Sequence, residues 1–239
     1  MKIALNGTRG VPAQYGGFET CAEELGKRLA AKGHEIWVYS RSDYYRSRLK
    51  EFAGMRLVYM PAVNIKFFET LSHTFFSLLH ATIKKFDILL VFNNANSPLL
   101  IIPKIFRKKV VFHMDGLEWK RGKWKGAGQK YYKFAEWLAT KLSFELVRDS
   151  NELKRYFEKK YGKDSNYIAY GAPLQQSRES SILAQFDLEP GNYFLMITRF
   201  EPENNPLLAV NAFEKLNTEK KLVLVGGIKY KSEYSKCFY

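Results

Sequence analysis

A glycine-rich segment at residues 7–20 contains the first residues whose types and spacing suit a chemical role. It reads GTRGVPAQYGGFET, and Gly16 and Gly17 stand directly before a helical pattern. Glycines at a helix start let backbone N–H groups approach a phosphate or a sugar, and the positive helix end favours an anion. The spacing is not G-x-G-x-x-G, so the dinucleotide-binding fingerprint is not met. The segment predicts phosphate or sugar binding, with a plain tight loop as the alternative.

A histidine and an aspartate mark the end of a second apolar run. His113 lies at the carboxyl end of Val110–Met114, and Asp115 follows on the next loop. Parallel α/β proteins place ligand-binding groups at that end of their strands. A neutral imidazole can hydrogen-bond a sugar hydroxyl there, and the carboxylate can orient one. A strand-end histidine that is satisfied within the core is the alternative.

Tryptophans and cations are interleaved over residues 116–130. Two tryptophans stand among five basic residues, namely Trp119 and Trp124 with Lys120, Arg121, Lys123, Lys125 and Lys130. Exposed tryptophans beside cations suit an interface that is part apolar and part anionic, as a lipid headgroup region is. The segment therefore predicts a protruding loop that contacts a membrane or a lipid pyrophosphate. The same interleaving can stack single-stranded bases, and a loop that closes over a cleft is a third possibility.

The charge of the chain predicts an anionic partner. The net charge is +14, and residues 104–163 contain 17 Lys and Arg against 7 Asp and Glu. Such a patch favours nucleic acid, an acidic membrane leaflet or a phosphorylated ligand, or it is the solvated face of a basic protein. No RNA-binding or helix-turn-helix pattern accompanies it, so nucleic acid is not the expected partner.

Composition and missing motifs exclude other classes of function. Cys21 and Cys237 are too few and too distant for a disulfide framework, which predicts a reducing compartment. No stretch has the ~18 apolar residues of a membrane span, and the first residues lack a signal-peptide pattern. We therefore expect a cytoplasmic protein. No D-x-D pair, metal-ligand spacing or G-x-S-x-G signature occurs, which excludes metalloenzymes and serine hydrolases.

The elements that must position these residues alternate between strands and helices. Strands are predicted at residues 2–6, 34–40, 55–60, 87–92, 109–114, 144–148, 167–170, 193–198 and 221–225, and helices at 22–31, 70–84, 129–142, 151–160 and 206–216. This order predicts a doubly wound, Rossmann-like α/β domain with a parallel sheet over residues 1–170. A polar linker is expected at 171–192, and an incomplete second Rossmann-like domain at 193–239.

Several blocks together resemble a known family. They are residues 7–20, the stretch GHEI at 33–36, ETLSHT at 69–74, NNANSP at 93–98 and DGLEWKRGKW at 115–124. They are similar to the N-terminal domain of retaining family-four glycosyltransferases, and more closely to the bacterial rhamnosyltransferase subfamily. The resemblance implies a GT-B fold, no obligatory metal, and a nucleotide-sugar donor held between two Rossmann-like domains.

The resemblance also implies roles for individual residues. Gly16, Gly17 and Glu19 would contact phosphate or acceptor, while His113 and Asp115 would hold the donor sugar. Arg199 matches the arginine of the family's G-R-x-x-x-x-K diphosphate clamp, whose glycine and lysine positions are Thr198 and Asn204 here.

The implied reaction joins a sugar to a lipid-linked saccharide in capsular or exopolysaccharide synthesis. The donor would be dTDP-rhamnose, and the acceptor an undecaprenyl-diphosphate-linked sugar at the inner face of the cell membrane. The family's acidic E-x7-E element would lie beyond residue 239, so we expect the chain alone to be inactive. A non-catalytic membrane- or glycolipid-binding fragment and a nucleic-acid binder are the alternatives.

Overall fold

The protein forms two compact units in the computed structural model. The structure describes residues 1–14, 16–65, 68–122, 124–172, 180–227 and 234. Unit 1 comprises Met1–Lys120 and Trp124–Gly171, and unit 2 comprises Arg121–Lys123 and Ala172–Tyr239. Each unit is described by itself.

Unit 1 is built on an eight-stranded sheet in the order β3-β4-β2-β1-β5-β6-β7-β8. The strands are β1 (Lys2–Asn6), β2 (Glu35–Arg41), β3 (Glu51–Phe52), β4 (Met55–Met60), β5 (Ile88–Phe92), β6 (Val110–Met114), β7 (Glu145–Arg148) and β8 (Asn166–Tyr167). All neighbours are parallel except the short pair of β3 and β4. The predicted doubly wound α/β fold is confirmed.

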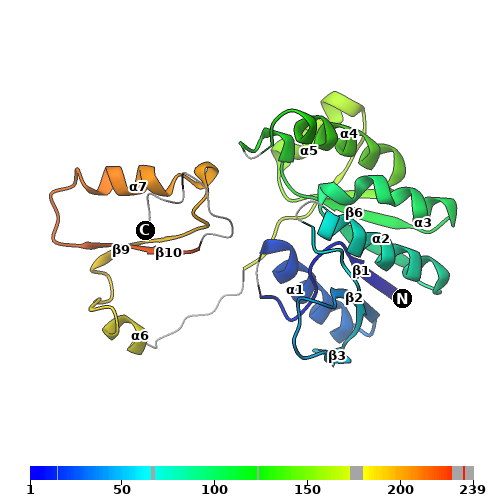
Figure 1. Ribbon diagram of the computed structural model, residues 1–239, viewed down its shortest axis with the longest axis horizontal. Coiled ribbons are helices and arrows are strands. Elements are labelled where there is room, and N and C mark those ends of the chain that lie inside the picture. Colours follow the sequence, from blue (N-terminus) through cyan, green and yellow to red (C-terminus); the bar gives the residue numbers. More distant parts are fainter. Residues whose placement is uncertain (15, 66–67, 123, 173–179, 228–233, 235–239) are drawn as a thin grey trace. The chain divides into compact units, whose positions relative to one another are not determined.

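Helices cover both faces of this sheet (Figure 1). They are α1 (Gly17–Ala31), α2 (Phe68–Ile83), η1 (Asn94–Leu100), α3 (Ile101–Ile105), η2 (Glu118–Lys120), α4 (Ala127–Leu142) and α5 (Asn151–Tyr161). One core holds Leu78 of α2, Ala139 of α4 and Phe157 of α5 against the sheet. The other core packs Ala22 of α1 against the opposite face. The alternation of side chains along each strand divides the apolar residues between these two cores.

Unit 2 is a small parallel pair of strands with short helices. Its elements are α6 (Ser181–Ala184), β9 (Tyr193–Ile197), η3 (Pro202–Asn204), α7 (Pro206–Phe213) and β10 (Lys221–Val225). Strands β9 and β10 pair in register from Tyr193 with Lys221 to Ile197 with Val225. Many of the apolar side chains of β9 stay exposed, including Phe194, Leu195 and Ile197.

Candidate functional site

The strand order creates a switch point beside β1. Strand β1 lies between β2 and β5, because the chain first adds strands on one side of it and then crosses to the other. In open α/β sheets, ligands bind outside the carboxyl ends of the strands at such a point. Two segments leave the sheet there, the loop at residues 7–16 after β1 and the turn at 93–96 after β5.

Backbone crowding explains two glycines of the first loop. Gly7 has φ +88°, and a Cβ there would lie 2.4 Å from the carbonyl oxygen of Phe92. Gly10 has φ +117°, and a Cβ there would lie 2.1 Å from Oγ of Ser40. Only glycine accepts both the conformation and the lack of space. The loop is therefore fixed against β2 and β5 at the switch point.

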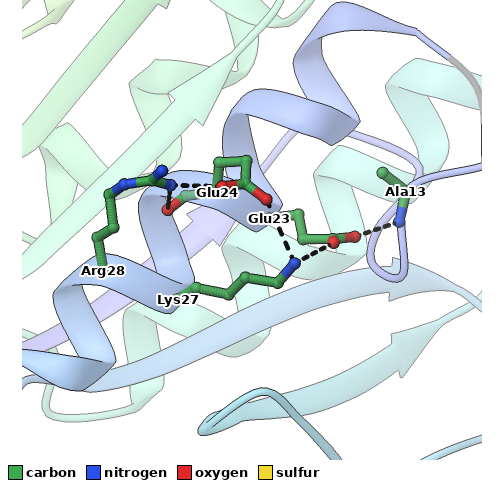
Figure 2. A network of polar contacts seen from close by, with 5 residues as sticks. All are labelled: Ala13, Glu23, Glu24, Lys27 and Arg28. Carbon is green, nitrogen blue, oxygen red and sulfur yellow. Dashed lines mark hydrogen bonds and ion pairs between the residues drawn. The ribbon is translucent and has the colours of Figure 1, made fainter. Parts of the chain in front are cut away.

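Two carboxylates of α1 fasten the rest of the loop. Oε1 of Glu19 accepts a hydrogen bond from the Arg9 amide at 2.9 Å, and Oε2 of Glu23 accepts one from the Ala13 amide at 2.6 Å. Figure 2 shows that Glu23 is held in turn by Lys27, whose Nζ lies 2.5 Å from Oε1. These contacts tie the loop to α1 at Arg9 and Ala13.

Helix α1 begins at Gly17, and no described side chain caps its first amides by a hydrogen bond. Gly16 caps it with φ +98° and offers no side chain to the first amides. A Cβ at Gly17 would meet nothing within 4 Å, so this position has space for a ligand group. Glu19 is buried and turned toward Arg9, so it positions the loop through the protein rather than offering itself to a phosphate.

His113 lies among aromatic rings at the end of β6. Its ring centroid is 6.0 Å from that of Phe18, 5.4 Å from that of Phe92 and 5.4 Å from that of Tyr170. Phe18 belongs to the first turn of α1, so His113 and Gly17 face the same edge of the sheet. Burial lowers the pKa of His113 to about 4, so the imidazole is neutral at pH 7. Its Nδ1 has no hydrogen-bond partner among the described residues.

The neighbouring strand end carries two charged residues, Arg148 and Asp149, that the sequence did not predict. Arg148 ends β7 and is fully buried, with its guanidinium 3.5 Å from the ring centroid of Phe157. Burial lowers the pKa of Arg148 to about 10. Burial, followed by the charge of Asp115, raises the pKa of Asp149. Asp115 and Asp149 therefore lie close enough to influence each other at the carboxyl ends of β6 and β7.

Amide side chains line the switch point. Nδ2 of Asn96 donates to the Phe92 carbonyl at 2.8 Å, and Nδ2 of Asn94 donates to the Gly116 carbonyl at 3.1 Å. Their Oδ1 atoms, and both polar atoms of buried Asn6, have no partner in the described parts of the chain. Such groups can bond the hydroxyls of a polar ligand. The NNANSP block pointed to this turn, whereas nothing in the sequence singled out Asn6.

Arg41 and Glu69 form a second unforeseen pair, at the end of β2. The Arg41 guanidinium is buried, is paired with the Glu69 carboxylate and donates to Oγ1 of Thr70 at 3.0 Å. The contact fixes the start of α2 to the carboxyl edge of the sheet. The ETLSHT block contains two of these residues, but its partner lies 28 positions earlier in the chain.

The expected exposure of the tryptophans is wrong. Trp119 and Trp124 are half-buried, because each indole N–H is bound by a carboxylate. Trp119 donates to Glu136 at 2.8 Å, and Trp124 donates to Glu118 at 3.1 Å. Glu136 also accepts from Tyr156, Tyr161 and Lys160, which ties η2 to α4 and α5.

The cations of that segment lie in different settings. Lys120 is exposed, with its Nζ 5.5 Å from the ring centroid of Trp119, and Arg121 is half-buried. Lys123 lies outside the described residues.

Arg199 and Asn204 belong to unit 2, where Nδ2 of Asn204 donates to the Arg199 carbonyl at 3.0 Å. Unit 1 therefore brings together the predicted residues 16, 17, 19, 113 and 115 at one sheet edge.

No group of three or more His, Cys, Asp or Glu side chains in the described ranges has the arrangement of a metal site. Among the helices that the structure describes, none is long and apolar enough to cross a membrane.

A doubly wound unit of this topology has the fold of the GT-B glycosyltransferases. HepE of Anabaena, solved with UDP and glucose, matches with a TM-score of 0.72 and 16% identity over 98% of this chain. The catalytic domain of starch synthase IV of Arabidopsis thaliana, bound to ADP and acarbose, gives 0.68 and 14% over 99% of this chain and 70% of its own. UGT89C1 of Arabidopsis thaliana, complexed with UDP-L-rhamnose, gives 0.55 and 16% over 94% of this chain and 68% of its own.

The chain spans 63% of the length of the HepE chain. No curated protein sequence matches it significantly. The chain belongs to the family described as Domain of unknown function (DUF1972), which matches residues 1–173.

Proposed function

We propose that this chain is the acceptor-side part of a glycosyltransferase that moves a sugar from a nucleotide-sugar donor to a saccharide acceptor. The observation that carries the proposal is the convergence of the glycine-rich loop, the start of α1 and neutral His113 at the switch point. UDP and glucose in the HepE structure and UDP-L-rhamnose in the UGT89C1 structure support the same class of donor.

The polar side chains of unit 1 suit the groups that react in such a transfer. In the transfer, the bond between the anomeric carbon and the diphosphate breaks, and the acceptor hydroxyl forms the new bond and loses its proton to the departing phosphate. A neutral imidazole can hydrogen-bond a sugar hydroxyl without repelling the positive charge that develops on the sugar ring. Asp115 and Asp149 can orient the acceptor hydroxyl and favour that developing charge.

The family-like blocks of the sequence support a more specific proposal for the sugar, the donor and the acceptor. The sugar is L-rhamnose from dTDP-rhamnose, transferred with retention by front-face attack within an ion pair. The acceptor is an undecaprenyl-diphosphate-linked saccharide of capsule or exopolysaccharide synthesis, at the cytoplasmic face of the membrane. Arg199 and Asn204 contact the donor diphosphate, the arginine with charge assistance and the amide without it.

Ligand-detected NMR on the full chain tests the proposal, because it reports binding as weak as about millimolar. We expect saturation transfer from the protein to dTDP-rhamnose, with UDP-glucose and free rhamnose as comparison ligands. His113→Ala should abolish the signal of the sugar protons. His34→Ala is the matched control, since His34 stands at the start of β2, at the opposite edge of the sheet.

The outcomes separate the coarse and the fine proposals. Saturation transfer to UDP-glucose but not to dTDP-rhamnose would support a glycosyltransferase and contradict the rhamnosyl donor. Equal signals from the His113→Ala and parent chains would remove His113 from the sugar site. If no sugar nucleotide received saturation from the protein, the result would contradict a donor contact in this chain.

A further inference from the structure

The exposed residues of α2 are all apolar, although Ser72 and His80 are half-exposed between them. These exposed residues all have large side chains, namely Phe68 (60% exposed), Phe75 (41%), Phe76 (38%), Leu79 (44%) and Ile83 (69%). The opposite side of the helix is buried in the core of unit 1 through Leu78 and Ala81. A surface helix normally presents polar residues to water, so exposed apolar side chains on this helix indicate a surface that a partner covers.

Helix α3 extends this apolar surface. It packs beside α2 in unit 1 and exposes Ile101 (46%), Ile105 (69%) and, directly after its end, Phe106 (52%). We call the exposed apolar residues of α2 and α3, with Phe106, the α2–α3 face. Contiguous exposed apolar surface of this kind marks a contact with a protein or a membrane.

Cations rim the α2–α3 face where its helices end. Lys84 and Lys85 follow α2, and Lys104, Arg107 and Lys109 are exposed in or just after α3. Asp87 is the one acidic residue between positions 83 and 109, and it accepts a hydrogen bond from the Lys2 amide. The face therefore combines apolar side chains with a positive margin.

We propose that the α2–α3 face docks unit 1 on an anionic phospholipid surface. Apolar side chains enter the boundary between headgroups and acyl chains, while the lysines and Arg107 contact the headgroup phosphates. The docking surface differs from the 116–130 segment, whose tryptophans are held by carboxylates of the protein itself.

The direction of α2 connects this face with the candidate site. Its first turn is fixed to the carboxyl edge of the sheet, since Glu69 and Thr70 bind Arg41. A membrane that lies along α2 therefore reaches the sheet edge at which His113 and the glycine-rich loop are found. This inference goes beyond the proposed function and does not require nucleotide-sugar binding.

Vesicle flotation of the full chain tests the inference. The probes are vesicles of phosphatidylcholine with phosphatidylglycerol and vesicles of phosphatidylcholine alone. We expect the parent to float with the anionic vesicles only, and the Phe76→Ser, Leu79→Ser double variant to lose at least about tenfold in apparent affinity. Lys84→Glu with Lys85→Glu should lose a similar factor, and added salt should weaken the parent in the same direction.

Matched variants distinguish docking from general effects of charge or polarity. Ile168→Ser removes another exposed apolar side chain, and Lys32→Glu with Lys50→Glu gives the same change of net charge elsewhere on the surface. Both controls should float like the parent, and circular dichroism should give all variants the parent's melting curve. Equal flotation by all variants, or none by the parent, would overturn the proposal. So would a parent dimer that Phe76→Ser, Leu79→Ser converts to a monomer in light scattering.

Discussion

The two units of the chain bury their side chains to very different degrees. Unit 1 has two apolar cores, one on each face of its sheet, and they include fully buried Leu5, Phe92 and Phe112. In the described residues 180–227 of unit 2, only Pro206 is buried. The sequences of strands β9 and β10 are as apolar as those of the strands in unit 1. The difference teaches that an apolar strand gains stability only when helices or other strands cover both of its faces.

Amide hydrogen exchange should give the largest contrast between the units. We expect the amides of β1 and β5 to exchange at least about 10³-fold more slowly than those of β9 and β10, because the first pair opens only with the whole of unit 1. Exchange measured by mass spectrometry resolves both regions in one experiment. Similar protection in β10 and β5 would mean that unit 2 is covered in solution.

A glycine substitution repeated in each unit sharpens the comparison. Gly10→Ala should lower the free energy of unfolding of unit 1 by about 3 kcal/mol, because its Cβ collides with Ser40 and φ is +117°. Gly191→Ala in unit 2, at φ +79° with open space around it, should cost about 1 kcal/mol and leave the unfolding of unit 1 unchanged. Urea denaturation followed by tryptophan fluorescence measures the first effect, since Trp37, Trp119, Trp124 and Trp137 all lie in unit 1. A Gly10→Ala chain as stable as the parent would contradict the close contact.

Acid should destabilise unit 1 selectively. Burial lowers the pKa of His73 and of His113 to about 4 each, so the unfolded chain binds more protons than the folded one at pH values between about 4 and 6.5. The stability is fully present above about pH 6.5 and is lost as the pH falls toward 4, by about 3 kcal/mol for each histidine. All four histidines of the chain lie in unit 1.

Denaturation curves between pH 7 and 4 measure this loss. Replacing His73 with Gln removes one titrating group, so the stability of that variant should change less with pH than that of the parent. A stability that rises on acidification would contradict the neutral state of the buried imidazoles.

Two serine substitutions give the smallest contrast. Ser150 caps α5 in unit 1 by accepting the Leu153 amide at 3.2 Å, so Ser150→Ala should cost about 1 kcal/mol of unfolding free energy. Ser180 stands at the same position before α6 in unit 2 and makes no side-chain cap bond. Ser180→Ala should have no measurable effect when urea denaturation of both variants is followed by circular dichroism, which reports on the helices of both units. Equal costs for the two would show that the cap bond does not stabilise α5.

The sequence predicted the regular elements closely where the pattern was local. Strands β1, β4 and β10 have the predicted bounds, whereas α1 begins five residues earlier than predicted. The predicted strand at 167–170 is a two-residue strand that ends at Tyr167. The rest of that segment leads to Tyr170, which packs on His113 instead of extending the sheet. An aromatic run in the sequence does not say which partner its rings will find.

The candidate site was predicted only in part. Gly17 and His113 meet at one edge because parallel strands carry their carboxyl ends together, and this topology was readable from the alternation of elements. Arg148, Asn6 and the pair of Arg41 with Glu69 were not predicted, because their burial depends on segments far away in the chain. The tryptophans of residues 116–130 were misjudged for the same reason, since Glu136 lies on a later helix.

The sequence by itself determined the class of fold, the position of the glycine-rich loop and the strand that carries His113. These features rest on local periodicity and on backbone conformations that only glycine adopts. Only the tertiary structure decided which polar groups are buried without partners, which tryptophans are bound, and that large apolar side chains of α2 stay exposed. The physical reason is that burial is a property of packing between distant segments, and an apolar helix has the same sequence pattern whether its second face meets protein or not.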